Sequence, residues 1–283
     1  MTAQTLHGVL YGHGHMGQLH AKKLSSRTGI KLAIVDPNQG LHTATESRPD
    51  FAIIATPTQA HAQVALPLLE QGVPCLVEKP LAYRLSDAED LAQYAHLSVG
   101  HIERFNPIFQ SVEGANPEYI DIERLAPNSG RSSDIDVIGD LMIHDIDLVL
   151  KYMPGIVTDV RAKGVGITSH LPDLVNARIE IAMTNGKTGV ANLTASRVST
   201  ISLRTWRLFE DGQYWSLDLI KKEGKTIQWP HNSRPLIVDK TDALTSEHDA
   251  FLGAVKGQNP YPCTGKEALA ALQLAERVRQ CLH

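Results

Sequence analysis

Cysteine is scarce in this sequence, where Cys75, Cys263 and Cys281 are the only three among 283 residues. An odd number of cysteines without Cys-x-x-Cys spacing argues against a disulfide framework and against a structural zinc site. The sequence therefore predicts free thiols, a reducing cytoplasmic location and no bound metal.

Long apolar runs and an excess of basic residues are missing as well. No stretch approaches the roughly 20 apolar residues that a membrane-spanning helix needs, and the N-terminus lacks the features of a signal peptide. A formal net charge of -4 gives no broad basic surface for nucleic acid or for an anionic membrane. We expect a soluble, unprocessed protein whose partner is a small molecule.

The first third of the chain alternates short apolar runs with helical segments. Such alternation is typical of a parallel sheet with crossover helices, so we expect six short strands in one nucleotide-binding sheet. Only 14 residues, 37–50, separate Asp36 from Phe51, and a helix in this crossover must be short or absent. The expected strands include Leu6–Tyr11, Leu32–Val35, Phe51–Ala55, Cys75–Val77 and Ser98–His101.

After about Pro117 the pattern changes to longer alternating runs joined by turn dipeptides. Asn185-Gly186 and Asp211-Gly212 are hairpin signals that favour a mainly antiparallel sheet. A closing helix over residues 266–281 follows Thr264, a candidate cap.

These patterns predict an α/β chain with two domains. Residues 1–117 should form an N-terminal Rossmann fold that binds a dinucleotide. Residues 118–283 should form a C-terminal α+β domain containing a mainly antiparallel open sheet. Because an open sheet leaves one face to be covered, we expect a homo-oligomer, a dimer or tetramer, assembled through this second domain.

A glycine-rich turn, Gly12-His13-Gly14-His15-Met16-Gly17, follows the first expected strand and opens a helix. Its glycines allow a pyrophosphate to approach the free N–H groups of the helix N-terminus. Asp36 ends the next strand, where a carboxylate accepts hydrogen bonds from the adenosine ribose hydroxyls and repels a 2'-phosphate. We therefore expect NAD rather than NADP, and we interpret His13 and His15 as surface or cofactor-facing residues rather than a metal pair.

Two polar turns follow later strands: Ala55-Thr56-Pro57-Thr58, with His61 nearby, and Glu78-Lys79-Pro80. Open α/β sheets bind ligands at this edge. In this order the motifs resemble those of the Gfo/Idh/MocA family of sugar and cyclitol dehydrogenases, whose Glu-Lys-Pro lysine lies beside the nicotinamide and the reacting hydroxyl. The resemblance implies that Lys79 stabilises the alkoxide character that develops when a secondary alcohol is oxidised. The expected cofactor-binding residues are Gly12, Gly14, His15, Met16, Gly17, Asp36, Thr56, Pro57, His61, Glu78 and Lys79.

Asp140, His144 and Asp147 are spaced by four and three residues in a helical pattern, which places them on one face of a helix. An aspartate one turn before a histidine can hold the imidazole tautomer and raise its basicity, as a general base requires. The run resembles the second catalytic motif of the same family, with Asp140 and His144 at its acid and base positions. The resemblance leaves open whether Lys79 or His144 takes the hydroxyl proton; we favour His144 as base and Lys79 as electrostatic clamp.

Four further segments, residues 99–107, 140–150, 173–180 and 191–199, resemble one branch of the family, the UDP-N-acetylglucosamine 3-dehydrogenases. The resemblance implies a UDP-sugar substrate, whose diphosphate suits the forked donors of arginine. A dehydrogenase of a free sugar or cyclitol and a non-catalytic dinucleotide-binding regulator are the alternatives. The candidate substrate-binding residues are Arg104, Asn106, Arg131, Asn176 and Arg197.

Overall fold

The computed structural model describes residues 5–42, 48–127, 135–168, 170–230, 232–239 and 241–282. The chain divides into two compact units, the first formed by residues 1–102 and 244–270 and the second by residues 103–243 and 271–283. This division differs from the single boundary expected after residue 117, because the chain returns to the first unit at residue 244. None of the described helices is both long and apolar enough to span a bilayer.

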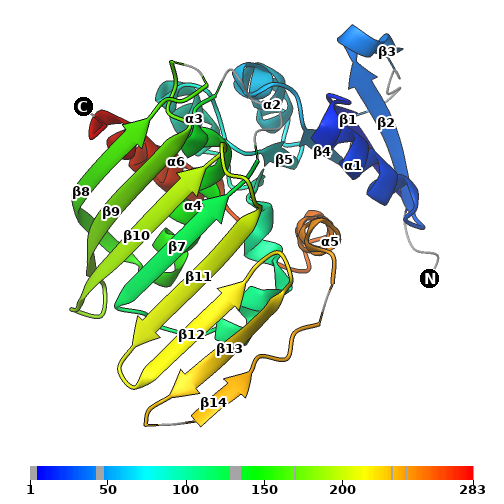
Figure 1. Cartoon of the computed structure of the whole chain (residues 1–283). Coiled ribbons are helices and arrows are strands. Elements are labelled where there is room, and N and C mark those ends of the chain that lie inside the picture. Colours follow the sequence, from blue (N-terminus) through cyan, green and yellow to red (C-terminus); the bar gives the residue numbers. More distant parts are fainter. Residues whose placement is uncertain are drawn as a thin grey trace. The chain divides into compact units, whose positions relative to one another are not determined.

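The first unit is built on a six-stranded sheet in the order β3-β2-β1-β4-β5-β6, whose strands pair in parallel except β2 and β3 (Figure 1). The strand order reverses between β1 and β4, which lie side by side. The described part of the crossover after β2 holds a short 3-10 turn, η1, and the two-residue strand β3, but no α-helix, as its length predicts. The elements are β1 (Leu6–Tyr11), α1 (His15–Ser25), β2 (Ile30–Asp36), η1 (Pro37–Gln39), β3 (Leu41–His42), β4 (Phe51–Ile54), η2 (Thr58–Ala60), α2 (His61–Glu70), β5 (Cys75–Glu78), α3 (Leu85–Leu91) and β6 (Leu97–Gly100).

Helix α5 (Ala243–Val255) contributes to the core of the first unit from a distant part of the sequence. Its Phe251 is fully buried and meets the ring of Phe51 on β4 edge-on, with the ring centroids 6.1 Å apart. Leu10 and Leu24 belong to the same apolar cluster. Full burial of one such side chain contributes roughly 1.5–3 kcal/mol, which explains why the chain returns to this unit.

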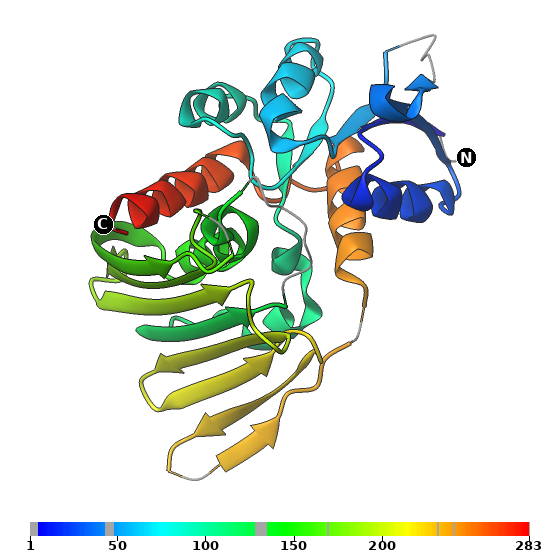
Figure 2. The same ribbon diagram turned by 45° about the horizontal axis from the view of Figure 1, so that its top comes forward.

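The second unit carries an eight-stranded sheet in the order β14-β13-β12-β11-β7-β10-β9-β8. Strands β7 and β10 pair in parallel and the other described pairs are antiparallel, so the expected mainly antiparallel sheet is confirmed. Helix α4 lies over one face of this sheet (Figure 2). The elements are η3 (Ile102–Phe105), η4 (Pro107–Val112), β7 (Tyr119–Leu125), η5 (Ile138–Met142), α4 (Ile143–Tyr152), β8 (Gly155–Val165), β9 (Leu174–Met183), β10 (Thr188–Ser196), β11 (Leu203–Glu210), β12 (Gln213–Asp218), β13 (Glu223–Gln228) and β14 (Asn232–Pro235).

Local sequence signals determine several turns and caps. Gly186 and Gly212 have φ values of 83° and 69° in the hairpins β9–β10 and β11–β12, as the Asn-Gly and Asp-Gly dipeptides predict. Helix α6 (Gly265–Gln280) begins directly after Thr264. The Thr264 N–H donates to Glu267 Oε2 at 2.8 Å, and the Glu267 N–H donates to Thr264 Oγ1 at 3.4 Å, which forms a reciprocal cap.

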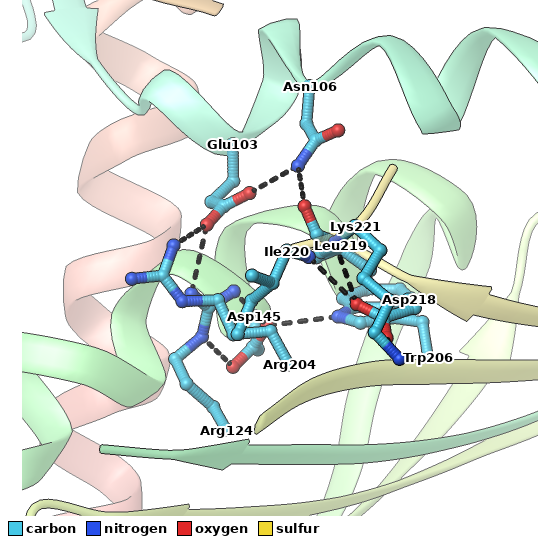
Figure 3. A network of polar contacts seen from close by, with 10 residues as sticks. All are labelled: Glu103, Asn106, Arg124, Asp145, Arg204, Trp206, Asp218, Leu219, Ile220 and Lys221. Carbon is cyan, nitrogen blue, oxygen red and sulfur yellow. Dashed lines mark hydrogen bonds and ion pairs between the residues drawn. The ribbon is translucent and has the colours of Figure 1, made fainter. Parts of the chain in front are cut away.

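A buried ion-pair network fixes helix α4 to the sheet of the second unit (Figure 3). Arg124 on β7 is 2% exposed; its Nε and Nη2 donate to both oxygens of Asp145, each at 2.7 Å, and its Nη1 donates to Glu103 at 3.0 Å. Trp206 Nε1 also donates to Asp145, and Arg204 donates to Glu103. Burial alone would raise the pKa of Glu103, but Arg124 and Arg204 hold it below its usual range. Two carboxylates and two guanidinium groups thus balance each other in charge.

We expect Asp145→Asn to destabilise the second unit strongly, because it leaves the buried Arg124 charge without its bidentate partner. Removing one partner of a buried ion pair typically costs about 3–5 kcal/mol of unfolding free energy. Arg204→Ala is the matched control, since the Arg204 side chain is 46% exposed and Glu103 keeps Arg124 as a partner; we expect it to cost about 1 kcal/mol or less, as for solvent-exposed charges. Urea unfolding measures both values, and equal losses would contradict the assigned roles.

Candidate functional site

Close backbone contacts shape the glycine-rich turn between β1 and α1. Gly12 has a φ of +89°, and a Cβ at this position would lie 2.5 Å from the carbonyl oxygen of Ala55 after β4. A Cβ at Gly17 would overlap the carbonyl oxygen of Gly12. At Gly14, the N-cap residue of α1, a Cβ would meet nothing within 4 Å. The turn is therefore closed on its sheet side and open in front of the helix N-terminus.

Asp36 at the end of β2 holds the same turn in place. Its Oδ2 accepts a hydrogen bond from the backbone N–H of His13 at 2.7 Å, and its Oδ1 accepts one from that of Asn38 at 3.0 Å. A carboxylate has about four acceptor positions, so acceptor capacity is left for a ligand. In the first turn of α1, His15 is exposed and Met16 is half-buried.

His61 joins the two polar turns that follow β4 and β5. Its ring is 1% exposed, with Nε2 lying 3.0 Å from the carbonyl oxygen of Thr56 and Nδ1 lying 3.1 and 3.3 Å from those of Pro80 and Leu81. Burial lowers the pKa of His61, although hydrogen bonds to these carbonyls oppose the shift. The sequence placed His61 among the cofactor ligands, whereas the structure buries its ring between the turns. Pro57 of the first turn is exposed.

The Glu-Lys-Pro turn stands at the end of β5. Lys79 is half-buried, and its backbone N–H donates to Glu78 Oε2 at 3.3 Å. Glu78 Oε1 lies 2.9 Å from Nε2 of His20 on α1. The glycine-rich turn, the Thr56 turn and the Lys79 turn thus follow neighbouring strands at their carboxyl ends, where open α/β sheets bind ligands.

Asp140 and His144 lie on either side of the start of α4 in the second unit. Residues 138–142 form a π-helical turn, in which the N–H of Ile143 donates to the carbonyl of Ile138, five residues back. The α-helical spacing expected between Asp140 and His144 therefore does not apply across this turn. Both side chains are partly exposed, and single π-helical turns are frequent at functional sites.

Two arginines that the sequence assigned to the substrate are held by buried carboxylates. Arg104 donates from Nε and Nη2 to the two oxygens of Asp147, both at 2.6 Å, and Asp147 is 1% exposed. Arg197 donates from Nε to Asp173 at 2.7 Å. Burial alone would raise the pKa of Asp173, but hydrogen bonds from the Thr168 backbone and from Arg197 hold it well below its usual range. Both guanidinium groups therefore brace the second unit.

The two candidate asparagines also have partners within the chain. Asn106 donates to the Leu219 carbonyl at 3.0 Å and to Glu103 at 3.2 Å. Asn176 donates to Thr194 at 2.9 Å between β9 and β10, in an exposed position. Arg131 lies outside the described residues. Asp140 and His144, the residues of this unit assigned to the chemical step, are both partly exposed.

Sequence reasoning missed a group of fully buried titratable residues in the first unit: His20, Glu247 and His248. A signal for them exists in the helical spacing. His20 shares the buried face of α1 with Leu24, and Glu247 and His248 stand between buried Leu244 and Phe251 on α5. Polar groups at such positions need partners, so they point to an internal network.

Comparisons with known proteins agree with this geometry. A family model described as "Oxidoreductase family, NAD-binding Rossmann fold" matches residues 17–98. The chain is 36% identical to the UDP-N-acetylglucosamine 3-dehydrogenase of Acidithiobacillus ferrooxidans, over 96% of this chain and 95% of that protein. A solved structure of a UDP-N-acetylglucosamine 3-dehydrogenase from the same organism has a TM-score of 0.88 at 33% identity, covering 98% of this chain and 97% of that chain.

A more distant likeness concerns the fold alone. The myo-inositol dehydrogenase of Corynebacterium glutamicum has a TM-score of 0.79 at 18% identity, covering 98% of this chain and 96% of that chain. The glycine-rich turn, the Glu-Lys-Pro turn and a relative with 36% identity along nearly the whole sequence lead to one conclusion. The chain belongs to the Gfo/Idh/MocA family of NAD-binding oxidoreductases.

Proposed function

We propose that this dehydrogenase oxidises the 3-hydroxyl of UDP-N-acetylglucosamine. The observation that carries the proposal is the 36% identity, along 96% of the chain, to a UDP-N-acetylglucosamine 3-dehydrogenase. A free sugar or a cyclitol is the alternative substrate. The presence of both Lys79 and His144 argues against a non-catalytic regulator.

The glycine-rich turn fits the diphosphate of NAD. Gly14 leaves open space at the N-terminus of α1, which has no side-chain cap, so its first N–H groups are available to an anion. Asp36 keeps acceptor capacity for ribose hydroxyls and disfavours a 2'-phosphate. NAD, when bound, supplies a hydride acceptor. The proposed contacts come from Gly12, Gly14, His15, Met16, Gly17, Asp36, Thr56, Pro57, Glu78 and Lys79.

The chain's own residues handle the proton and the charge of the reacting hydroxyl. We assign His144 as the base that takes the hydroxyl proton, with Asp140 supporting its basicity. The ammonium of Lys79 stabilises the negative charge that develops on the same oxygen. The exchange of these two roles, with Lys79 as base, is the alternative.

Arg104 and Arg197 stay candidates for contact with the diphosphate, although carboxylates of the chain hold part of each guanidinium group. Arg104 donates from Nε and Nη2 to Asp147, and Arg197 donates from Nε to Asp173, so a phosphate would have to use the remaining N–H groups. We therefore propose that these arginines order the second unit. Arg131 stays a candidate for contact with the diphosphate.

We further propose a homo-oligomer, a dimer or tetramer, and a cytoplasmic location. The sheet of the second unit exposes Tyr119 and Phe209, whose rings meet edge-on with centroids 5.6 Å apart, beside the Arg207–Asp121 ion pair. Aromatic and arginine side chains of this kind are enriched at interfaces. The three cysteines are free thiols, which supports a reducing compartment.

Gly14→Ala should weaken NAD binding without changing the fold. The φ of Gly14 is -68°, and an alanine Cβ would meet no atom of the chain, but it would occupy space assigned to the diphosphate. We expect the Kd for NAD to rise roughly tenfold, which is about 1.4 kcal/mol, and Tm to stay unchanged. Titration calorimetry and thermal melts measure the two effects, and an unchanged Kd would contradict the placement of the diphosphate.

Lys79→Ala and His144→Ala should each still bind NAD and lose most turnover. Removal of a positioned acid, base or charge stabiliser typically lowers kcat by about 10²–10³-fold. Asp140→Asn should be milder, because it acts through the imidazole. NADH absorbance gives kcat and a binding titration gives the Kd for NAD; normal turnover in either alanine variant would remove that residue from the proposed chemistry.

UDP-N-acetylglucosamine with NAD should give NADH and a 3-keto sugar nucleotide, whereas free N-acetylglucosamine should be a far poorer substrate. Binding energy from the remote nucleotide would orient the 3-hydroxyl, so its removal should lower kcat as well as affinity. NADH absorbance follows each reaction, and a transaminase with glutamate traps the ketone. Equal rates would refute the nucleotide-sugar proposal and favour a free sugar, while no turnover on any sugar would favour the regulator.

A further inference from the structure

A group of four titratable side chains lies inside the first unit, beside the Glu-Lys-Pro turn. His20 comes from α1, Glu78 from β5, and Glu247 and His248 from α5. His20, Glu247 and His248 have no exposed surface, and Glu78 is 8% exposed. Buried polar groups are costly unless they are paired, so the arrangement of these four requires an explanation.

Two short contacts link three of the four side chains. His20 Nε2 lies 2.9 Å from Glu78 Oε1, and His20 Nδ1 lies 2.7 Å from His248 Nε2. The two imidazole planes are tilted by 38° with their centroids 5.0 Å apart. His20 therefore connects the Glu78 carboxylate to α5 through both of its ring nitrogens.

The Glu78 carboxyl group is also held on its other sides. Its Oε2 accepts the N–H of Lys79 at 3.3 Å. A Cβ added to Gly100 on β6 would lie 3.2 Å from three atoms of the carboxyl group, so the neighbouring strand leaves little free space. A displacement of the carboxyl group would therefore also displace the Lys79 N–H that it accepts, and with it the backbone of Lys79.

The fourth member of the group, Glu247, is fully buried on α5. Burial, and secondarily the nearby Glu78 carboxylate, raise the pKa of Glu247 well above its usual range. A raised pKa favours the uncharged form of this carboxyl group. His61 on α2 is a further titratable group near Glu78, whose charge opposes the lowering of the His61 pKa by burial.

We propose that His20 is a positioning residue, which holds the Glu78 carboxylate and, through it, the backbone that presents Lys79, and that His248 supports it from α5. This rests on the role of Lys79 in the proposed function. Either of two proton arrangements makes both contacts: His20 donates to Glu78 and accepts from His248, or His20 donates to both partners. In each arrangement His20 Nε2–H donates to the Glu78 carboxylate, so the position of the carboxylate is maintained.

Two substitutions at His20 separate its two contacts. In His20→Gln the amide can reach the place of Nε2 and keep a donor on Glu78; in His20→Asn it can reach only the place of Nδ1, on the side of His248. Because small displacements of a reacting group lower rates strongly, we expect His20→Asn to lower kcat roughly tenfold or more. His20→Gln should stay within about threefold of the wild type, and both should bind NAD within about twofold.

His96→Asn is the matched control, since His96 Nε2 contacts only the Leu69 carbonyl among the described hydrogen bonds, at 3.1 Å, away from Glu78. It should leave kcat unchanged. In the Lys79→Ala background, His20→Asn should cause no further loss, because its effect passes through Lys79. Equal losses of kcat in the two His20 variants, or no loss in His20→Asn, would overturn the proposal.

A second measurement needs no substrate and so separates this proposal from the proposed function. Acylation of the Lys79 amine by an amine-reactive reagent, followed by peptide mass spectrometry, reports the surroundings of Lys79 directly. We expect the rate at Lys79 to change at least about threefold in His20→Asn and to stay unchanged in His20→Gln and His96→Asn. An unchanged rate in His20→Asn would refute the positioning role even if no sugar is oxidised. A changed rate together with normal turnover in Lys79→Ala would refute only the catalytic role of Lys79.

Discussion

The contact between the glycine-rich turn and the end of β4 is the constraint on which the site in the first unit depends. Gly12 lies against the Ala55 carbonyl, and Gly17 lies against Gly12, with no room for a side chain at either position. Because backbone meets backbone, the two turns are placed without adjustable side chains between them. His61 then lies between the second turn and the Lys79 turn, with its ring nitrogens 3.0 to 3.3 Å from three carbonyl oxygens. The glycine-rich turn, the turn after β4 and the Glu-Lys-Pro turn are therefore held in fixed positions relative to one another.

In the second unit, buried ion pairs rather than backbone contacts fix the position of the candidate base, His144. His144 is followed on α4 by Asp145, which binds Arg124, and by Asp147, which binds Arg104. The helix is therefore anchored one and three residues after the imidazole. Buried pairs of this kind add little net stability, because desolvation offsets their attraction, but they allow few alternative positions. We interpret them as devices that fix where α4 lies, and with it His144.

Much of the fold could be predicted because its signals are local. The apolar runs, the Asn185-Gly186 turn and the Thr264 cap each require only neighbouring residues. The return of α5 to the first unit could not be predicted, because it depends on Phe251 fitting a core built from strands about two hundred positions earlier. The π-helical turn before His144 was missed for a similar reason: its residues have ordinary helical spacing, and tertiary packing selects the extra residue per turn.

The turns of the candidate site could be predicted from the sequence, whereas the partners that its side chains find within the chain could not. An arginine fork fits a carboxylate of the chain as well as a phosphate of a ligand, so residue type alone cannot choose between them. The positions of two aspartates in the sequence indicate that carboxylates of the chain compete for these arginines. Asp147 stands among apolar residues on an amphipathic helix, and Asp173 directly precedes Leu174 and Val175 at the start of β9. A carboxylate in such surroundings must find a cation or hydrogen-bond donors inside the fold. If those acids are paired first, Arg104 and Arg197 are the cations available to them. The same reasoning applied to the buried Glu78 leads to His20.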